Sequence, residues 1–303
     1  MRSAPPAGLA CWSAGIERTD GAGARVAGLR ITTRNARFQQ WQAQLANRNK
    51  RQRAREFLVQ GVRPISQAVA HGWPIRALLF DADRQLSRWA RELLAEVRAE
   101  KVAMAAELLA ELGEKEEGAP ELVAVAELPA DELSRIPVGP DFLGVLFDRP
   151  TSPGNIGTIV RSADSFGAHG LVVTGHAADA YDPKSVRAST GSLFALPVVR
   201  SPGHREVSAW LAGVSTPITV VGLDEDGEAD VADFDLTGPV LLAVGNETVG
   251  LSAGWRERCD AVLRIPMTGS ASSLNAASAA TVVLYEAARQ RGRGGRPAGQ
   301  CAS

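Results

Sequence analysis

The sequence predicts an α/β protein with two domains, and three observations carry this prediction. Its 303 residues, 45% hydrophobic and 22% charged, are enough for roughly two soluble domains with cores of their own. Strand-like apolar segments alternate with helical patterns from residue 57 onward. Residues 142–148, FLGVLFD, are apolar on both faces, which is typical of a strand in a parallel sheet covered by helices. We therefore expect a small N-terminal α/β domain and a second domain built on a parallel sheet.

Changes in composition along the chain give the expected domain boundaries. Residues 1–24 are rich in Ala, Gly and Pro, and we expect a disordered lead-in there. A basic segment and the small α/β domain follow in residues 25–140, and the second domain spans residues 141–291. The last residues, 292–303, are expected to form a disordered tail.

The formal net charge of −1 hides a basic segment near the N-terminus. Between Arg25 and Arg63 the chain has ten basic residues and a single acid, Glu56. The apolar spacing from Asn35 to Arg55 predicts one amphipathic helix with arginines on its polar face. Guanidinium groups suit phosphates, so we expect RNA contact, with a solvated surface helix as the alternative. The expected RNA-contacting residues here are Arg34, Arg37, Arg48, Lys50, Arg51, Arg53 and Arg63. Arg187, further along, is either another RNA contact or a structural cap.

The second domain opens with a predicted strand–helix–strand unit in residues 142–175. The segment after its first strand, RPTSPGNIG, is expected to be a loop, with Asn155 in it and Arg161 in the second turn of the helix that follows. An arginine that interrupts an apolar helical face is costly unless it is paired. An ion pair of Arg161 with Asp164 or Glu247 is therefore the alternative to a functional role.

Polar loops follow three later strand patterns, which end at Leu223, Gly245 and Met267. Ligands of open α/β sheets bind at the carboxyl ends of the strands, so these loops form the expected pocket. Gly245 would allow close approach of the backbone to a ligand. The serines of residues 270–273 can cap the following helix, and a plain loop before a helix has the same cap.

Several classes of protein are disfavoured by what the sequence lacks. It has no GxGxxG or GxxxxGK[ST] fingerprint, no recognisable Ser-His-Asp triad and no metal-ligand cluster. Its three cysteines are scattered without metal spacing. No apolar run reaches about 20 residues and no signal peptide is recognisable, so we expect a cytoplasmic protein without metal or membrane association. Among the enzyme classes considered, the one that remains is a transferase that moves a group from a bound donor molecule.

Three sequence blocks indicate the family to which such a transferase would belong. PTSPGNIGTIVRSADSFGAHG, LLAVGNETVGLS and RIPMTGSASSLNAASAA occur in this order within residues 141–290. They resemble the three motifs of the SpoU branch of the SPOUT methyltransferases, which transfer a methyl group from S-adenosylmethionine (AdoMet) to ribose 2′-hydroxyls of RNA. The N-terminal part resembles the L30e-like substrate-binding domain of this family. The resemblance implies a deep trefoil knot in the second domain and a homodimer with each pocket near the subunit interface.

The resemblance also implies roles for particular residues. Arg161 would be the catalytic arginine acting on the ribose hydroxyl. An arginine is a poor base, because its guanidinium stays protonated at any ordinary pH, so we expect Arg161 to orient the hydroxyl and stabilise the developing alkoxide. The residues expected to support it are Asn155, Glu247, Ser273 and Asn275. Those expected to hold AdoMet are Leu223, Gly245, Asn246, Ile265, Met267 and Leu274.

The RNA target is also implied by the resemblance. Over its whole length the chain resembles family members that methylate a uridine of 23S ribosomal RNA and confer resistance to orthosomycin antibiotics. Gln60 departs from the family pattern, because many members carry a glutamate before the glycine. The alternatives are a housekeeping ribosomal or transfer RNA ribose methyltransferase, and a non-catalytic RNA-binding protein with the same fold.

Overall fold

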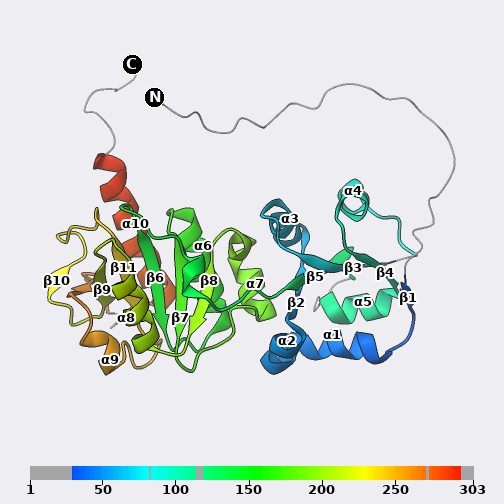
Figure 1. Cartoon of the computed structure of the whole chain (residues 1–303), viewed down its shortest axis with the longest axis horizontal. Helices are drawn as coiled ribbons and strands as arrows, with labels where there is room; N and C mark the ends of the chain where they lie inside the picture. Colours follow the sequence, from blue (N-terminus) through cyan, green and yellow to red (C-terminus); the bar gives the residue numbers. More distant parts are fainter. Residues whose placement is uncertain (1–28, 82, 114–118, 271–272, 295–303) are drawn as a thin grey trace, which may run out of the picture.

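The computed structural model describes residues 29–81, 83–113, 119–270 and 273–294. These residues form two α/β domains that lie side by side, as predicted (Figure 1). The expected disordered lead-in, residues 1–24, and residues 295–303 of the expected tail lie outside the described residues. The tail prediction is wrong for residues 292–294, because the last helix continues to Gly294.

The N-terminal domain is a mixed sheet in the strand order β1-β4-β3-β5-β2 with helices packed on it. In chain order its elements are β1 (Leu29–Ile31), α1 (Ala36–Ala46), α2 (Arg48–Ala54), β2 (Glu56–Gln60), α3 (Val62–Ala70), β3 (Ile75–Asp81), α4 (Arg88–Glu96), β4 (Glu100–Met104), α5 (Ala106–Gly113) and β5 (Leu122–Glu127).

The single helix predicted from Asn35 to Arg55 is two helices, α1 and α2. Asn47, between them, has an extended backbone with φ −125° and ψ 107°, and its side chain accepts a hydrogen bond from the backbone N–H of Lys50. Asparagine competes for backbone hydrogen bonds in this way, which favours a cap over a helix interior. Both sides of Asn47 are helical, as the apolar spacing predicts, and the break at Asn47 leaves no mark in that spacing.

The second domain is a parallel sheet in the strand order β10-β12-β9-β11-β6-β7-β8. In chain order its elements are η1 (Leu133–Arg135), β6 (Leu143–Asp148), α6 (Pro153–Ser165), β7 (Gly170–Thr174), α7 (Pro183–Ser189), η2 (Ser192–Phe194), β8 (Val198–Ser201), α8 (His204–Gly213), β9 (Thr219–Leu223), β10 (Ala229–Asp230), β11 (Val240–Val244), α9 (Ala253–Arg256), β12 (Ala261–Arg264) and α10 (Ala276–Gly294).

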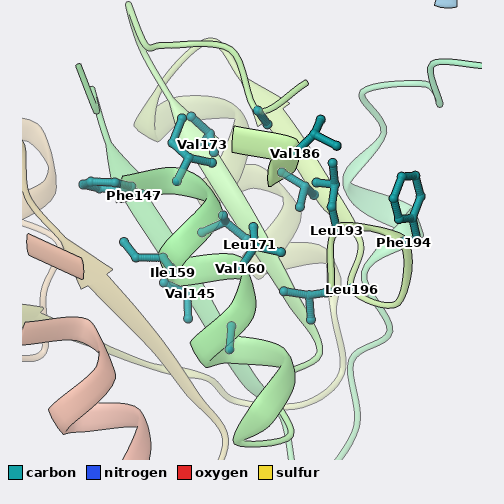
Figure 2. Packing of buried hydrophobic residues seen from close by; sticks show 14 of the residues in the cluster. Val145, Phe147, Ile159, Val160, Leu171, Val173, Val186, Leu193, Phe194 and Leu196 are labelled. Atoms are coloured by element: carbon teal, nitrogen blue, oxygen red, sulfur yellow. The ribbon is translucent and has the colours of Figure 1, made fainter. Parts of the chain in front are cut away.

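This strand order positions the site. The elements β6, α6 and β7 form the predicted strand–helix–strand unit, in which the two strands are parallel. Figure 2 shows their apolar side chains packed into one core: Val145, Phe147, Ile159, Val160, Leu171 and Val173. Because β12, β9 and β11 are neighbours and parallel, the loops after them meet at one edge of the sheet. The trefoil knot stays a prediction.

Aromatic side chains join the two domains. Phe57 of β2 packs against Tyr181, with ring centroids 4.9 Å apart. Trp73 packs edge-on against Phe194, with centroids 5.0 Å apart, and its Nε1 donates a 2.9 Å hydrogen bond to the carbonyl of Phe194. The hydrophobic cluster therefore continues across the junction of the domains.

A buried ion pair adds a polar link at the same junction. Arg51 of α2 is 2% exposed, and its Nη2 lies 2.7 Å from Oδ2 of Asp179 in the second domain. Removing one partner of a buried pair typically costs about 3–5 kcal/mol, because the other charge is left uncompensated. The prediction that Arg51 contacts RNA is wrong, because its guanidinium is enclosed between the domains.

No helix in the part of the chain that the structure describes is both long and apolar enough to cross a membrane.

Candidate active site

A cavity of about 410 Å³ opens at the carboxyl ends of β9, β11 and β12. The structure thus brings together the three polar loops that follow these strands. All six residues predicted to hold the cofactor line this cavity: Leu223, Gly245, Asn246, Ile265, Met267 and Leu274. Glu247 and Ser273 also line it, whereas Asn155, Arg161 and Asn275 do not. A second cavity of about 430 Å³, between the domains, contains none of the predicted site residues.

The loop after β11 closes into a small ring that forms one wall of the cavity. Asn246 and Gly250 exchange two backbone hydrogen bonds of 3.0 Å. The Oδ1 of Asn246 accepts from the backbone N–H groups of Thr248 and Val249, at 2.9 and 3.1 Å. The side chain of Asn246 is therefore occupied in shaping the loop.

Gly245 is needed for the same ring. A Cβ built on Gly245 would lie 2.3 Å from the backbone carbon of Gly250 and 2.3 Å from the backbone nitrogen of Leu251. The sequence suggested that a glycine here admits a ligand to the backbone. In the structure the close neighbours of Gly245 are Gly250 and Leu251, at the end of the same loop.

Glu247, in the middle of this loop, ties it to the start of α6. Its carboxylate accepts hydrogen bonds from the backbone N–H and Oγ1 of Thr151, both at 3.0 Å, from the backbone N–H of Ser152 at 3.1 Å, and from Nδ2 of Asn155 at 3.0 Å. Burial alone raises the pKa of Glu247, but the hydrogen bonds from Thr151, Asn155 and Ser152 outweigh burial and leave its pKa below the ordinary value. The group is therefore an ionised acceptor at neutral pH.

Asn155 and Asn275 extend this network to α10. The Nδ2 of Asn275 donates a 3.2 Å hydrogen bond to Oδ1 of Asn155. The Oδ1 of Asn275 accepts from the backbone N–H groups of Ala277 and Ser278, at 2.9 and 3.3 Å, so Asn275 caps the helix that the serines were expected to cap. Ser272, one of these serines, lies outside the described residues.

Asn155 lies in the first turn of α6, which corrects its predicted place in a loop. The helix begins early because Ser152 caps it, with Oγ accepting a 3.3 Å hydrogen bond from the backbone N–H of Asn155, and because Pro153 occupies the first helical position. Thr151 and Ser152, which were not predicted as site residues, are partners of Glu247. The Ser-Pro pair was the signal that could have indicated the helix start.

Arg161 lies six residues further along α6 and is exposed. Neither of the alternative ion pairs, with Asp164 or Glu247, is formed, and its guanidinium makes no hydrogen bond or ion pair with any described residue. Six residues on a helix of 3.6 residues per turn place Arg161 on a different face from Asn155. Within one chain, Arg161 therefore stands apart from the cavity.

The predicted RNA-contacting residues fall into two groups. Five are held by protein partners: Arg34 by Glu111, Arg37 by Glu100, Arg48 by the carbonyl of Ala177, Arg51 by Asp179, and Arg187 by Oε1 of Gln60. The other three, Lys50, Arg53 and Arg63, are exposed, and their side chains make no ion pair or hydrogen bond within residues 29–81, 83–113, 119–270 and 273–294.

The described residues contain no group of three or more His, Cys, Asp or Glu side chains that could hold a metal ion. Cys259 donates from Sγ to the carbonyl of Trp255 at 3.3 Å, and burial raises its pKa to about 11, so it is an unreactive packed thiol.

Replacing Glu247 with glutamine should destabilise the protein at neutral pH by about 1–3 kcal/mol, because charge-assisted hydrogen bonds are lost. A depressed folded-state pKa stabilises the fold above the unfolded value of 4.5, and this contribution is lost as the pH falls through the folded-state pKa. Urea unfolding of both proteins from pH 7 to pH 3 should show the difference shrinking. Glu225→Gln, at an exposed acid, is the control. A difference that stays constant with pH would contradict the role of the carboxylate charge.

Comparison with known proteins identifies the class. Residues 35–124 match the SpoU L30e-like domain, and residues 143–285 match the SpoU rRNA Methylase family. Together with the relatives below, these matches show that the chain belongs to the SpoU methyltransferase family, which confirms the resemblance seen in the sequence.

Individual relatives cover most of the chain. The 23S rRNA (uridine(2479)-2′-O)-methyltransferase of Streptomyces viridochromogenes is 69% identical over 265 residues, which cover 86% of this chain and 92% of that protein. The crystal structure of the SpoU methyltransferase AviRb from Streptomyces viridochromogenes in complex with AdoMet superposes with a TM-score of 0.83 at 68% identity, over 85% of this chain and 98% of that one. The AdoMet-bound rRNA methyltransferase from Sinorhizobium meliloti gives a TM-score of 0.76 at 28% identity, over 86% and 97% of the two chains.

Proposed function

We propose that this protein transfers a methyl group from AdoMet to the ribose 2′-hydroxyl of a uridine in 23S ribosomal RNA. The observation that carries the proposal is the single cavity lined by all six predicted cofactor residues, in a chain 69% identical to a 23S rRNA uridine 2′-O-methyltransferase. AdoMet supplies an electrophilic methyl on a positively charged sulfur, so the protein's share of the work is binding, orientation and charge stabilisation.

The chemistry of the cavity fits this cofactor. Its volume of about 410 Å³ is in the range of small-molecule sites. Ile265, Met267 and Leu274 offer apolar surface to the adenosine part. The rim carries the acidic residues 224–226, of which Asp224 is paired with Arg256, and exposed carboxylates there complement the positive charges of AdoMet.

Arg161 is the residue that acts on the ribose. As a permanently charged guanidinium without a partner among the described residues, it can bind the RNA phosphate, orient the 2′-hydroxyl and stabilise the alkoxide as it forms. The hydrogen bonds that connect Glu247, Asn155 and Asn275 fix the cavity wall relative to the starts of α6 and α10. Because Arg161 of one chain lies outside its own cavity, a homodimer that brings a second subunit to the cavity completes the site.

The experiment that tests the function uses labelled AdoMet with unmodified 23S RNA, 16S RNA and bulk transfer RNA. Label in 23S RNA alone is the expected result. Label in transfer RNA would instead support the housekeeping tRNA alternative, and the absence of label from all three RNAs, and from assembled large subunits, would favour a non-catalytic RNA-binding protein.

RNA binding should depend on Lys50, Arg53 and Arg63, the members of the predicted RNA-contacting set that are exposed and make no ion pair or hydrogen bond with a described residue. Replacing all three with alanine should weaken binding and flatten the plot of log K against log salt by about 2, because each phosphate contact contributes about 0.7–0.9 to the slope. The matched control removes Arg84, Arg91 and Arg98, which carry the same charge elsewhere on the N-terminal domain. Equal slopes for the two triple variants would mean that Lys50, Arg53 and Arg63 are ordinary solvated surface residues and do not contact RNA.

Resistance to an orthosomycin antibiotic is the proposed biological consequence, because a methyl group on a ribosomal ribose changes the surface a ribosome-targeting drug contacts. A susceptible strain that expresses the protein should tolerate the drug, and the same strain with Arg161→Ala should not. Equal susceptibility of the two strains would contradict this consequence.

A further inference from the structure

Arg149, between β6 and α6, has a backbone conformation that arginine rarely adopts. Its φ of 53° lies in the left-handed region, where the Cβ of an L-residue is crowded by its own backbone. Such strain persists only where the surroundings enforce it, and it is concentrated at functional sites. Arg149 was not predicted as a site residue, so the contacts that enforce this conformation are informative.

These contacts attach Arg149 to both ends of the ring-shaped loop 246–250. At the start of the loop, Nδ2 of Asn246 donates a 2.7 Å hydrogen bond to the carbonyl of Arg149. At its end, Nη2 of Arg149 donates a 3.2 Å hydrogen bond to the carbonyl of Gly250. A single residue thus holds the first and last residues of one wall of the cavity.

The guanidinium is itself held from the sheet. Its Nε lies 3.0 Å from Oδ2 of Asp148, a 3% exposed carboxylate that also accepts from the backbone N–H of Ser252 and from Oγ1 of Thr174, both at 3.0 Å. The backbone N–H of Arg149 donates to the carbonyl of Thr174 at 2.9 Å. Arg149 therefore connects the ends of β6 and β7 to the loop after β11.

The left-handed backbone explains how one residue does this. It turns the chain at the end of β6 so that the carbonyl of Arg149 faces Asn246 while the side chain reaches Gly250. A glycine at this position would adopt the turn without strain but would lose the contact to Gly250. The arginine keeps the strained turn and gains the second attachment.

We propose that Arg149 is a positioning residue that holds the loop 246–250 in the shape that receives AdoMet. The part of the proposal that concerns AdoMet depends on the proposed function. The part that concerns the loop does not, because it is a property of the ligand-free protein. Arg149 acts through the loop and takes no part in the methyl transfer itself.

The test replaces Arg149 with asparagine, which tolerates the left-handed region and removes the guanidinium. In the ligand-free protein, hydrogen exchange should accelerate about tenfold or more at the backbone amides of residues 248–250. A tenfold faster exchange rate is what the loss of about one modest stabilising interaction of the loop would produce. The affinity for AdoMet, measured by calorimetry, should fall by a similar factor. In the transfer assay the KM for AdoMet should rise while kcat at saturating AdoMet stays within about twofold.

The control is Arg291→Ala, since Arg291 of α10 donates to the carbonyls of Asp141, Phe142, Leu236 and Gly238, away from the loop. This variant should lose stability without faster exchange specific to residues 248–250. Unchanged loop exchange in Arg149→Asn, or an increase spread over the whole protein as in the control, would overturn the proposal. A wild-type protein that binds no AdoMet would refute the proposed function, and the exchange data would still decide the role of Arg149.

Discussion

Replacing Arg161 with alanine should reduce methyl transfer by about 100-fold or more while leaving the affinity for AdoMet within about twofold. The reason is the separation seen in the structure. Arg161 is exposed and unpaired among the described residues, and it does not line the cavity proposed to bind the cofactor. In the proposed function, its removal therefore takes away the group assigned to the RNA ribose and leaves the residues assigned to the cofactor in place.

The fold should tolerate this change. An exposed side chain without a protein partner contributes little to stability, so the free energy of unfolding should stay within about 0.5 kcal/mol of the wild type. Arg161→Lys should retain part of the activity, since it keeps the charge but not the planar fork. Arg205→Ala, at an exposed arginine of α8, is the matched control and should leave turnover unchanged. Near-normal turnover in Arg161→Ala would show that Arg161 is not a catalytic residue.

Replacing Gly245 with alanine should have the opposite pattern, with the affinity for AdoMet reduced by about 10- to 100-fold. The added Cβ would lie 2.3 Å from two backbone atoms of Gly250 and Leu251, and neither can move without opening the ring formed by Asn246 and Gly250. Overpacking against backbone atoms typically costs about 1–3 kcal/mol, and here the loss falls on a wall of the cavity.

Calorimetry with AdoMet, together with a thermal melt, measures this effect. Gly213→Ala is the control, because nothing lies within 4 Å of a Cβ built at that position. The control should bind AdoMet normally. Wild-type affinity in Gly245→Ala would mean that the ring-shaped loop is not needed for the cofactor.

The sequence was sufficient for the parts of the fold that depend on local patterns. The apolar run in residues 142–148 indicated a parallel sheet, and three strand ends with polar loops indicated where a pocket would lie. Both are present, because strand direction alone determines which loops meet at the edge of a parallel sheet. Local capping was less visible: Asn47 divides one expected helix into two, and Asn275 caps the helix that the serines were expected to cap.

The rest depended on partners that are distant in the sequence. Arg51 has a basic neighbourhood in the sequence, and only the fold shows that it is paired with Asp179, 128 residues away. Glu247 and Asn155 are separated by 92 residues, so their hydrogen bond follows from the adjacency of β11 and β6 and from no local signal. Arg149 was missed for the same reason, since its backbone conformation and its contact to Gly250 are both tertiary properties.

The measurement that tests the central claim most directly is the identity of the methylated nucleoside. Unmodified 23S RNA is treated with the protein and labelled AdoMet, digested completely to nucleosides and separated by chromatography. The account predicts that the label is found in 2′-O-methyluridine with the wild-type protein and is absent with Arg161→Ala. Label in a uridine methylated on its base, or in another nucleoside, would contradict it.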